Sequence, residues 1–184
     1  FMRDWRRNSA MSGGFMLEKC CHDLDLYQGV VGARASKVAS FGGRKKYLPE
    51  HRPAAATYLE EKLPRWNGTE DAFSGEGDLI DYQTALIKYE NGASMSFHTN
   101  LNVPDEFRRF AVIGRDGMAE GDFIRNTFKV TLSDTGQVLI QSDELAKASQ
   151  GNVGHYGADA AMIRDLMSFM EGDLTELPLS VIDA

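Results

Sequence analysis

Residues 81–101 read DYQTALIKYENGASMSFHTNL, and this stretch decides the fold class. Two runs rich in β-formers, 81–89 and 93–101, flank Asn91-Gly92, a signature of a two-residue hairpin turn. Side chains alternate between the faces of a strand, so the second run has a polar face and an apolar face. The polar face carries Ser94, Ser96, His98 and Asn100, and the apolar face carries Met95, Phe97 and Leu101. The stretch predicts an antiparallel hairpin.

More strands are expected on both sides of this hairpin. A short strand precedes it near 37–41, and four follow it, at 107–113, 118–124, 128–132 and 137–140. Glycine-containing turns at 114–117 and 134–136 separate the later runs. The succession of hairpins predicts an antiparallel meander.

Two helices are expected to cover this sheet. After Gly13-Gly14, helical periodicity gives an apolar stripe at Met16, Cys20, Leu24, Tyr27 and Val31. A second helix has its stripe at Ala161, Ile163, Leu166, Met167 and Met170. The predicted class is α+β, a predominantly antiparallel open sheet of about six or more strands with helices covering one face. Residues 44–76 are expected to form a surface excursion, with a short helix near 54–62 and a lid or substrate-facing role.

Composition excludes several classes of function. The chain has 184 residues and a net charge of −7, which argues against nucleic acid or an anionic membrane as a partner. No apolar run approaches the ~20 residues that cross a bilayer. Cys20 and Cys21 are adjacent, unlike a secreted disulfide framework, so a reduced, cytoplasmic protein is expected. Both ends of the sequence look like cuts through a longer protein.

Residues 13–25, GGFMLEKCCHDLD, contain the pattern with most chemical meaning. The two glycines are followed by Glu18, then by His22 four positions later, and then by Asp25. This pattern resembles the helix that opens the C-terminal domain of the glucose–fructose oxidoreductase, inositol dehydrogenase and rhizopine-catabolism (Gfo/Idh/MocA) family.

Three more segments resemble this family, in the same order along the chain. Trp5-Arg6-Arg7 is similar to an Arg/Trp-rich stretch found before the helix in one branch. Residues 89–94, YENGAS, resemble the first hairpin, and 112–117, VIGRDG, resemble a later strand and turn. Together the four motifs span nearly the whole chain.

The resemblance implies an oxidoreductase that acts on the CH–OH group of a sugar, polyol or related compound with NAD or NADP. It implies that His22 is the acid/base and that Glu18 is its acidic partner, a position where the family most often has Asp. Histidine suits the proton transfer because it titrates near neutral pH. Substrate contacts are expected from Lys19, Asp25 and Arg7.

The Glu18–His22 pair has two other interpretations. A Glu and a His spaced i, i+4 on a helix are, taken alone, also typical of a surface pair. A metal site is not expected, although Glu18, Cys20, Cys21 and His22 are all possible ligands. Cys20 falls on the apolar face, about 160° from His22, so one ion could not easily engage both.

The sequence contains three further histidines. His98, on the polar face of the hairpin, is a candidate for substrate contact, for a subunit interface or for a structural role. His155, before the last helix, is a second candidate for substrate contact. His51, in the charged excursion, is expected to be exposed.

No glycine-rich turn stands between a strand and a helix, the arrangement that cradles a dinucleotide pyrophosphate. Residues 1–184 are therefore expected to be the C-terminal domain without the nucleotide-binding Rossmann domain, and to be inactive alone. The resemblance also implies a homo-oligomer formed through the open sheet face. The alternative is a stand-alone, non-catalytic α+β module for ligand binding or assembly.

Overall fold

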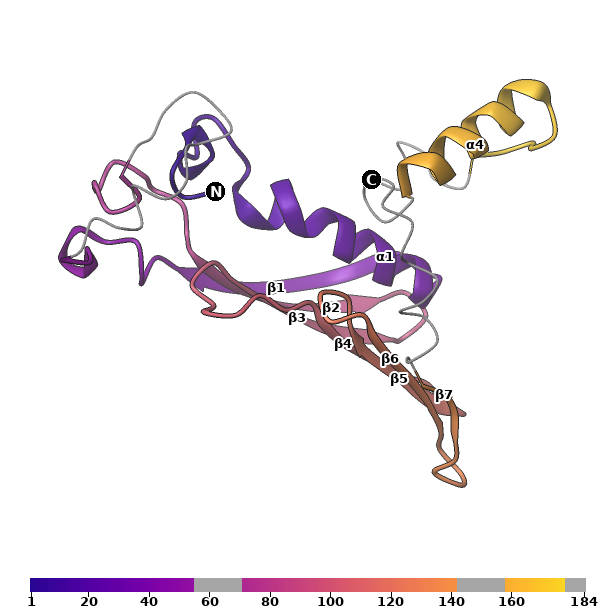
Figure 1. Cartoon of the computed structure of the whole chain (residues 1–184). Helices are drawn as coiled ribbons and strands as arrows, with labels where there is room; N and C mark the ends of the chain where they lie inside the picture. Colours follow the sequence, from indigo (N-terminus) through magenta and orange to yellow (C-terminus); the bar gives the residue numbers. More distant parts are fainter. Residues whose placement is uncertain (55–70, 142–157, 178–184) are drawn as a thin grey trace. The chain divides into compact units, whose positions relative to one another are not determined.

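A computed structural model of the chain describes residues 1–54, 71–141 and 158–177 (Figure 1). Its helical elements are η1 (Trp5–Arg7), η2 (Met16–Cys20), α1 (Cys21–Val31), η3 (Pro49–His51) and α4 (Ala158–Glu171). Its strands are β1 (Ala35–Gly43), β2 (Tyr82–Tyr89), β3 (Ser94–Asn100), β4 (Arg109–Ile113), β5 (Gly117–Asp122), β6 (Thr127–Leu132) and β7 (Val138–Gln141). All described pairings are antiparallel, which confirms the α+β class. The chain divides into two compact units, Phe1–Val103 and Pro104–Ala184.

The first unit contains a three-stranded sheet in the order β1-β2-β3. The β2–β3 hairpin is confirmed, but its turn is longer than the two residues predicted. Tyr89 donates to Ala93 O at 2.9 Å, Gly92 donates to Tyr89 O at 3.1 Å, and Gly92 has a φ of +91°. These bonds enclose a three-residue loop that ends on a left-handed glycine, and this loop pairs Lys88 with Ser94.

Burial alternates along β2 and β3 and distinguishes the two faces of these strands, whereas β1 is exposed except at Gly43. Ala85 and Tyr89 are buried, while Leu86 between them is 53% exposed. On β3, Met95 and Phe97 are half-buried while Ser94, Ser96 and His98 are exposed, as predicted. Helix α1 runs along one face of the sheet (Figure 1). We assign the buried side as the face that α1 covers, which leaves the face with His98 open.

The second unit contains a four-stranded sheet in the order β4-β5-β6-β7. The predicted meander is thus divided into two sheets, and β1, the strand expected near 37–41, brings the strands of the described residues to seven. The first unit ends at Val103, and Pro104, which has no N–H to donate, opens the second. The Phe110 ring lies over Gly121, where an added Cβ would be 3.0 Å from the ring.

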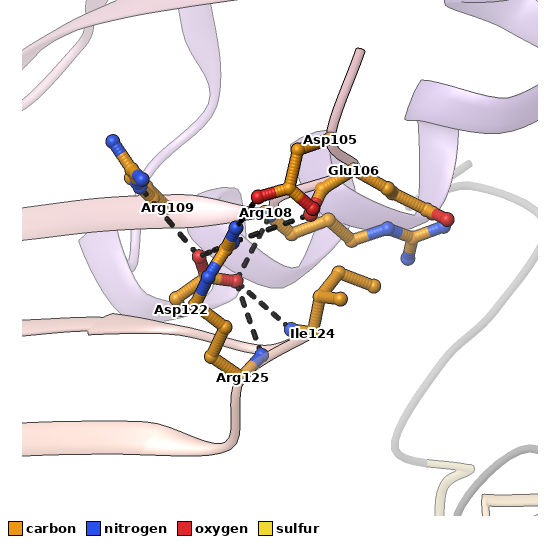
Figure 2. A network of polar contacts seen from close by, with 7 residues as sticks. All are labelled: Asp105, Glu106, Arg108, Arg109, Asp122, Ile124 and Arg125. Carbon is orange, nitrogen blue, oxygen red and sulfur yellow. Dashed lines mark hydrogen bonds and ion pairs between the residues drawn. The ribbon is translucent and has the colours of Figure 1, made fainter. Parts of the chain in front are cut away.

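A buried carboxylate organises one end of this second sheet (Figure 2). The Asp122 side chain is 5% exposed and accepts backbone hydrogen bonds from Arg108 (3.1 Å), Ile124 (3.0 Å) and Arg125 (3.4 Å). The Arg125 guanidinium donates to its Oδ2 at 2.7 Å and also pairs with Asp105. Burial raises the pKa of Asp122, but these hydrogen bonds outweigh burial and lower it to about 2.

A small hydrophobic core holds the N-terminal segment of the first unit. Met2, Ala72 and Phe73 are buried there, and Phe1, Tyr47 and Leu101 pack against them. Asp81, 2% exposed, accepts backbone hydrogen bonds from residues 45, 46 and 47, the first at 3.0 Å. The described parts of the 44–76 excursion are therefore packed and hydrogen-bonded, while most of the short helix expected near 54–62 lies outside the described residues.

The last described helix, α4, confirms the second helical prediction. It ends at Glu171, and Gly172 follows with a φ of +84°, the left-handed conformation that commonly terminates a helix. In the described parts of the chain, no helix is both long and apolar enough to span a bilayer.

Candidate functional site

The candidate site lies on the helix that begins at Gly14, and the segment before this helix is fixed by hydrogen bonds. Ser12 Oγ donates to Arg6 O at 2.8 Å, and Gly14 N–H donates to Ser12 Oγ at 3.2 Å. Gly14 is buried with a φ of +87°, which favours glycine at this entry to the helix. The local sequence thus sets where the helix starts.

Arg7 anchors this entry segment to the chain 64–72 residues further on. Its side chain is 4% exposed, and it donates to Asp71 O at 2.6 Å and to Glu76 Oε2 at 3.1 Å. Its carbonyl accepts from Asp78 N and Leu79 N, both at 3.2 Å. The Arg7 side chain, which was expected to contact substrate, is thus buried and already engaged by residues 71 and 76.

The helix contains a π turn, η2, which leads directly into α1. A π turn forms i→i+5 hydrogen bonds and holds about one residue more than an α turn, and such turns occur frequently at functional sites. Glu18 and Lys19 lie within this turn, and His22 is the second residue of α1. The simple i, i+4 alignment expected of Glu18 and His22 is altered here.

The two residues of the expected catalytic pair have different partners. Glu18 turns back to the helix start, where its Oε1 accepts from Gly13 N–H at 3.4 Å. His22 is exposed, and its Nδ1 lies 3.3 Å from the Sγ of Cys21. Within the described residues, no hydrogen bond joins Glu18 to His22. The two side chains share the helix but are not bonded to each other.

The neighbouring candidates share this helix. Lys19 is exposed and Asp25 is half-buried. Tyr27 is half-buried as well, and burial together with the Asp23 carboxylate raises its pKa to about 12. The Tyr27 phenol therefore stays protonated at neutral pH, so it can donate a hydrogen bond but cannot act as a base.

The other histidines are not part of this helix. His98 lies on the open face of the first sheet, where its Nδ1 is 2.8 Å from Thr84 Oγ1. By the burial pattern, the sheet separates His98 from α1. His51 is exposed at the end of η3, as expected, and His155 lies outside the described residues.

Cys20 and Cys21 have different environments. Cys20 is 4% exposed, as its place on the apolar stripe predicted, while Cys21 is half-buried and contacts His22. Across the described ranges, no group of three or more His, Cys, Asp or Glu side chains could hold a metal ion. The Cys21–His22 contact was not predicted, because adjacent helical residues ordinarily do not face each other.

Known proteins similar to this chain are oxidoreductases by name. YteT of Bacillus subtilis (strain 168), which carries a provisional oxidoreductase name, is 22% identical over 210 aligned positions, 90% of this chain and 49% of that protein. The chain thus spans about half the length of this curated relative.

Two solved structures share the fold at low identity. An aldose-aldose oxidoreductase from Caulobacter crescentus, solved with glycerol, has a TM-score of 0.60 and 13% identity, covering 100% of this chain and 45% of that one. Levoglucosan dehydrogenase, solved with NADH, has a TM-score of 0.52 and 20% identity, covering 76% and 32%. A family comparison matches residues 1–120 to the GFO/IDH/MocA C-terminal domain. That match covers well over half of the chain, which confirms the resemblance: the chain belongs to the GFO/IDH/MocA C-terminal domain family.

Proposed function

We propose that this chain is the substrate-side domain of an NAD(P)-dependent oxidoreductase that acts on the CH–OH group of a sugar, polyol or related compound. The observation that carries the proposal is the exposed His22, placed where the π turn joins α1, on the same helix as Glu18, Lys19 and Asp25. Family membership and the sugar-oxidoreductase names of the similar proteins support it.

His22 transfers the proton in this proposal. Its Nδ1 is turned toward Cys21, so Nε2 is the ring nitrogen that faces a substrate hydroxyl and takes its proton. When NAD(P) is bound, its nicotinamide supplies the acceptor for the hydride that leaves the same carbon. Glu18 is the proposed acidic partner one turn before His22 on the same helix, and its carboxylate also accepts a hydrogen bond from Gly13 at the helix start.

Lys19 and Asp25 are proposed to bind the substrate. A polyol presents several hydroxyls, and an ammonium group and a carboxylate supply the donors and acceptors that orient them. Arg7 fits a supporting role, because its guanidinium is engaged by Asp71 and Glu76. His155 remains a candidate on sequence grounds.

NAD(P) itself is proposed to bind mainly to a nucleotide-binding domain outside these 184 residues. A dinucleotide site needs a parallel strand–helix–strand unit with a glycine-rich turn, and every described strand pairing is antiparallel. The described residues therefore fit the substrate side of the reaction and not the pyrophosphate site.

We also propose a cytoplasmic homo-oligomer formed through the open face of the first sheet. Phe41 is 70% exposed and Leu86 53% exposed on this face, and His98 lies beside them. Both cysteines are free thiols, which suits a reducing compartment. Phe41→Lys should lower the mass measured by light scattering; an unchanged mass would place any interface elsewhere.

The test of the activity compares two histidine variants in the natural protein that carries this sequence, with NAD⁺ and NADP⁺ and a panel of sugars and polyols. His22→Ala should lower kcat by about 10²–10⁴-fold, the usual contribution of a general base. His51→Ala, a matched change at an exposed histidine on η3, should leave kcat unchanged. Equal activity of both variants would refute the role of His22.

A second measurement tests whether the cofactor binds outside residues 1–184. Residues 1–184 alone should not bind NADH in a fluorescence titration. Tight NADH binding by this chain would contradict the proposed placement of the cofactor. Turnover of no panel member by the natural protein would instead favour the alternative, a non-catalytic binding or assembly module.

A further inference from the structure

The imidazole of His22 has a neighbour that the proposed mechanism does not yet use. Cys21 Sγ lies 3.3 Å from His22 Nδ1, while the Glu18 carboxylate faces Gly13 N–H. In the described residues, the thiol is thus the side chain in hydrogen-bonding contact with the ring. This inference rests on the proposed function and extends it.

We propose that Cys21 is a positioning residue for His22. Its sulfur accepts a hydrogen bond from Nδ1–H, which leaves Nε2 unprotonated and directed at the substrate hydroxyl. A neutral imidazole has one N–H and one acceptor nitrogen, so the partner of one nitrogen fixes the state of the other. With the sulfur as acceptor, the contact selects the tautomer that can take the substrate proton, whereas a thiol that donated to Nδ1 would select the opposite tautomer and overturn the proposal.

The backbone geometry explains how adjacent residues come into contact. Successive side chains of a regular α-helix point about 100° apart and do not face each other. Cys21 is the first residue of α1 and follows the π turn directly, so the contact forms at the change of helical pitch. Rigid helix on both sides holds the thiol in place without a long, flexible side chain.

The two neighbouring cysteines differ in the way this role requires. Cys20 is 4% exposed and belongs to the apolar stripe predicted for the helix. Cys21 is half-buried with its sulfur at the ring. Cys20→Ala is therefore a matched control that removes a thiol one residue away without touching the imidazole.

The direct test is the tautomer of His22, read from ¹⁵N chemical shifts of histidine-labelled protein at a pH where the ring is neutral. The His22 signals are assigned by their loss in His22→Gln. In the wild-type chain, the Nδ1–H form should be enriched at His22 relative to the exposed His51. Cys21→Ala should return His22 to the distribution of His51, Cys21→Ser should restore part of the enrichment, and Cys20→Ala should change nothing.

An unchanged His22 tautomer in a folded Cys21→Ala variant would overturn the proposal, whatever the activity. A serine that restores nothing would also overturn it, because a hydroxyl accepts the same hydrogen bond. Folding is checked by the amide spectrum of the first unit, which must match that of the wild type outside α1.

Kinetics of the natural enzyme give the second readout. Cys21→Ala should lower kcat about tenfold, the size of one modest hydrogen bond, with KM nearly unchanged. Cys21→Ser should recover part of this loss. An altered tautomer with unchanged kcat would overturn the positioning role, while an active His22→Ala variant would refute the proposed function itself. The two failures are therefore distinguishable.

Discussion

Asp122 gives the sharpest quantitative prediction, because its side chain is buried and its hydrogen-bond partners are known. Its side chain is 5% exposed and accepts three backbone N–H groups and the Arg125 guanidinium. Although burial alone raises its pKa, the hydrogen bonds lower it from 3.8 to about 2. At about 1.4 kcal/mol per pKa unit, the ionised carboxylate contributes on the order of 2 kcal/mol to folding.

The sign of the pH dependence follows from the lowered pKa. Because the folded state holds the ionised form more strongly than the unfolded state, the contribution of Asp122 is complete at pH values well above 4. It is lost as the pH falls toward 2, where the folded carboxyl takes up its proton. Linkage predicts that about half of the contribution remains at pH 3.

The variant that tests this contribution is Asp122→Asn, which keeps the size of the side chain and removes its charge. We expect the second unit to lose about 2 kcal/mol of stability at pH 7 and about 1 kcal/mol at pH 3. The matched control is Asp116→Asn, since Asp116 is 78% exposed and pairs with Arg115, itself 91% exposed. An exposed pair of this kind contributes less than about 1 kcal/mol, so the control should change little.

The assay must report on the second unit. Neither of the two tryptophans, Trp5 and Trp66, lies in the sequence range of the second unit, so tryptophan fluorescence is not the assay of choice. Amide hydrogen exchange of peptides from residues 109–132, followed by mass spectrometry, measures local opening directly. Protection equal to that of the wild type in Asp122→Asn would contradict the stabilising role of this carboxylate, as would a loss of the same size at pH 3 and pH 7.

Two further predictions concern pairs of glycines. Gly29→Ala should stabilise the chain by up to about 1 kcal/mol, because Gly29 lies inside α1 with open space around it. Gly32→Ala should cost about 1 kcal/mol, because Gly32 ends α1 at a φ of +67°. Melting temperatures measured by circular dichroism that shift in the same direction for both variants would contradict this. Gly121→Ala should destabilise the second sheet by about 3 kcal/mol, because the added Cβ would lie 2.2 Å from Thr127 O. Gly114→Ala should be nearly neutral, because the nearest atom to its added Cβ is 3.6 Å away. Equal hydrogen exchange in the last two variants would show that β5 moves aside.

The sequence predicted the strand faces well and the details of the turns less well. Alternation along 93–101 placed Ser96 and His98 on the exposed face, because period-two patterning reflects burial directly. The length of the hairpin loop was wrong, since Asn91-Gly92 suits both a two-residue turn and a three-residue loop ending on a left-handed glycine. Local sequence alone does not separate the two.

The buried carboxylates could not be predicted from local sequence. Asp81 and Asp122 stand at strand ends, and exposure is the ordinary expectation for a carboxylate. Their partners are backbone N–H groups that the fold brings to them: those of residues 45–47 for Asp81, and that of residue 108 for Asp122. Such groups carry no side-chain signature, so only the folded arrangement identifies these aspartates as anchors.

The candidate site shows both the strength and the limit of a motif. Helical spacing placed Glu18, Lys19, His22 and Asp25 on one helix, and they lie there. A helical wheel assumes 3.6 residues per turn, however, and the π turn at Met16–Cys20 departs from that period between Glu18 and His22. The partner of His22 Nδ1 is consequently the adjacent Cys21 and not the carboxylate four residues earlier. A motif fixes which residues share an element, but the hydrogen bonds among them depend on the pitch of its backbone, and this is why the role of Cys21 must be tested at the imidazole itself.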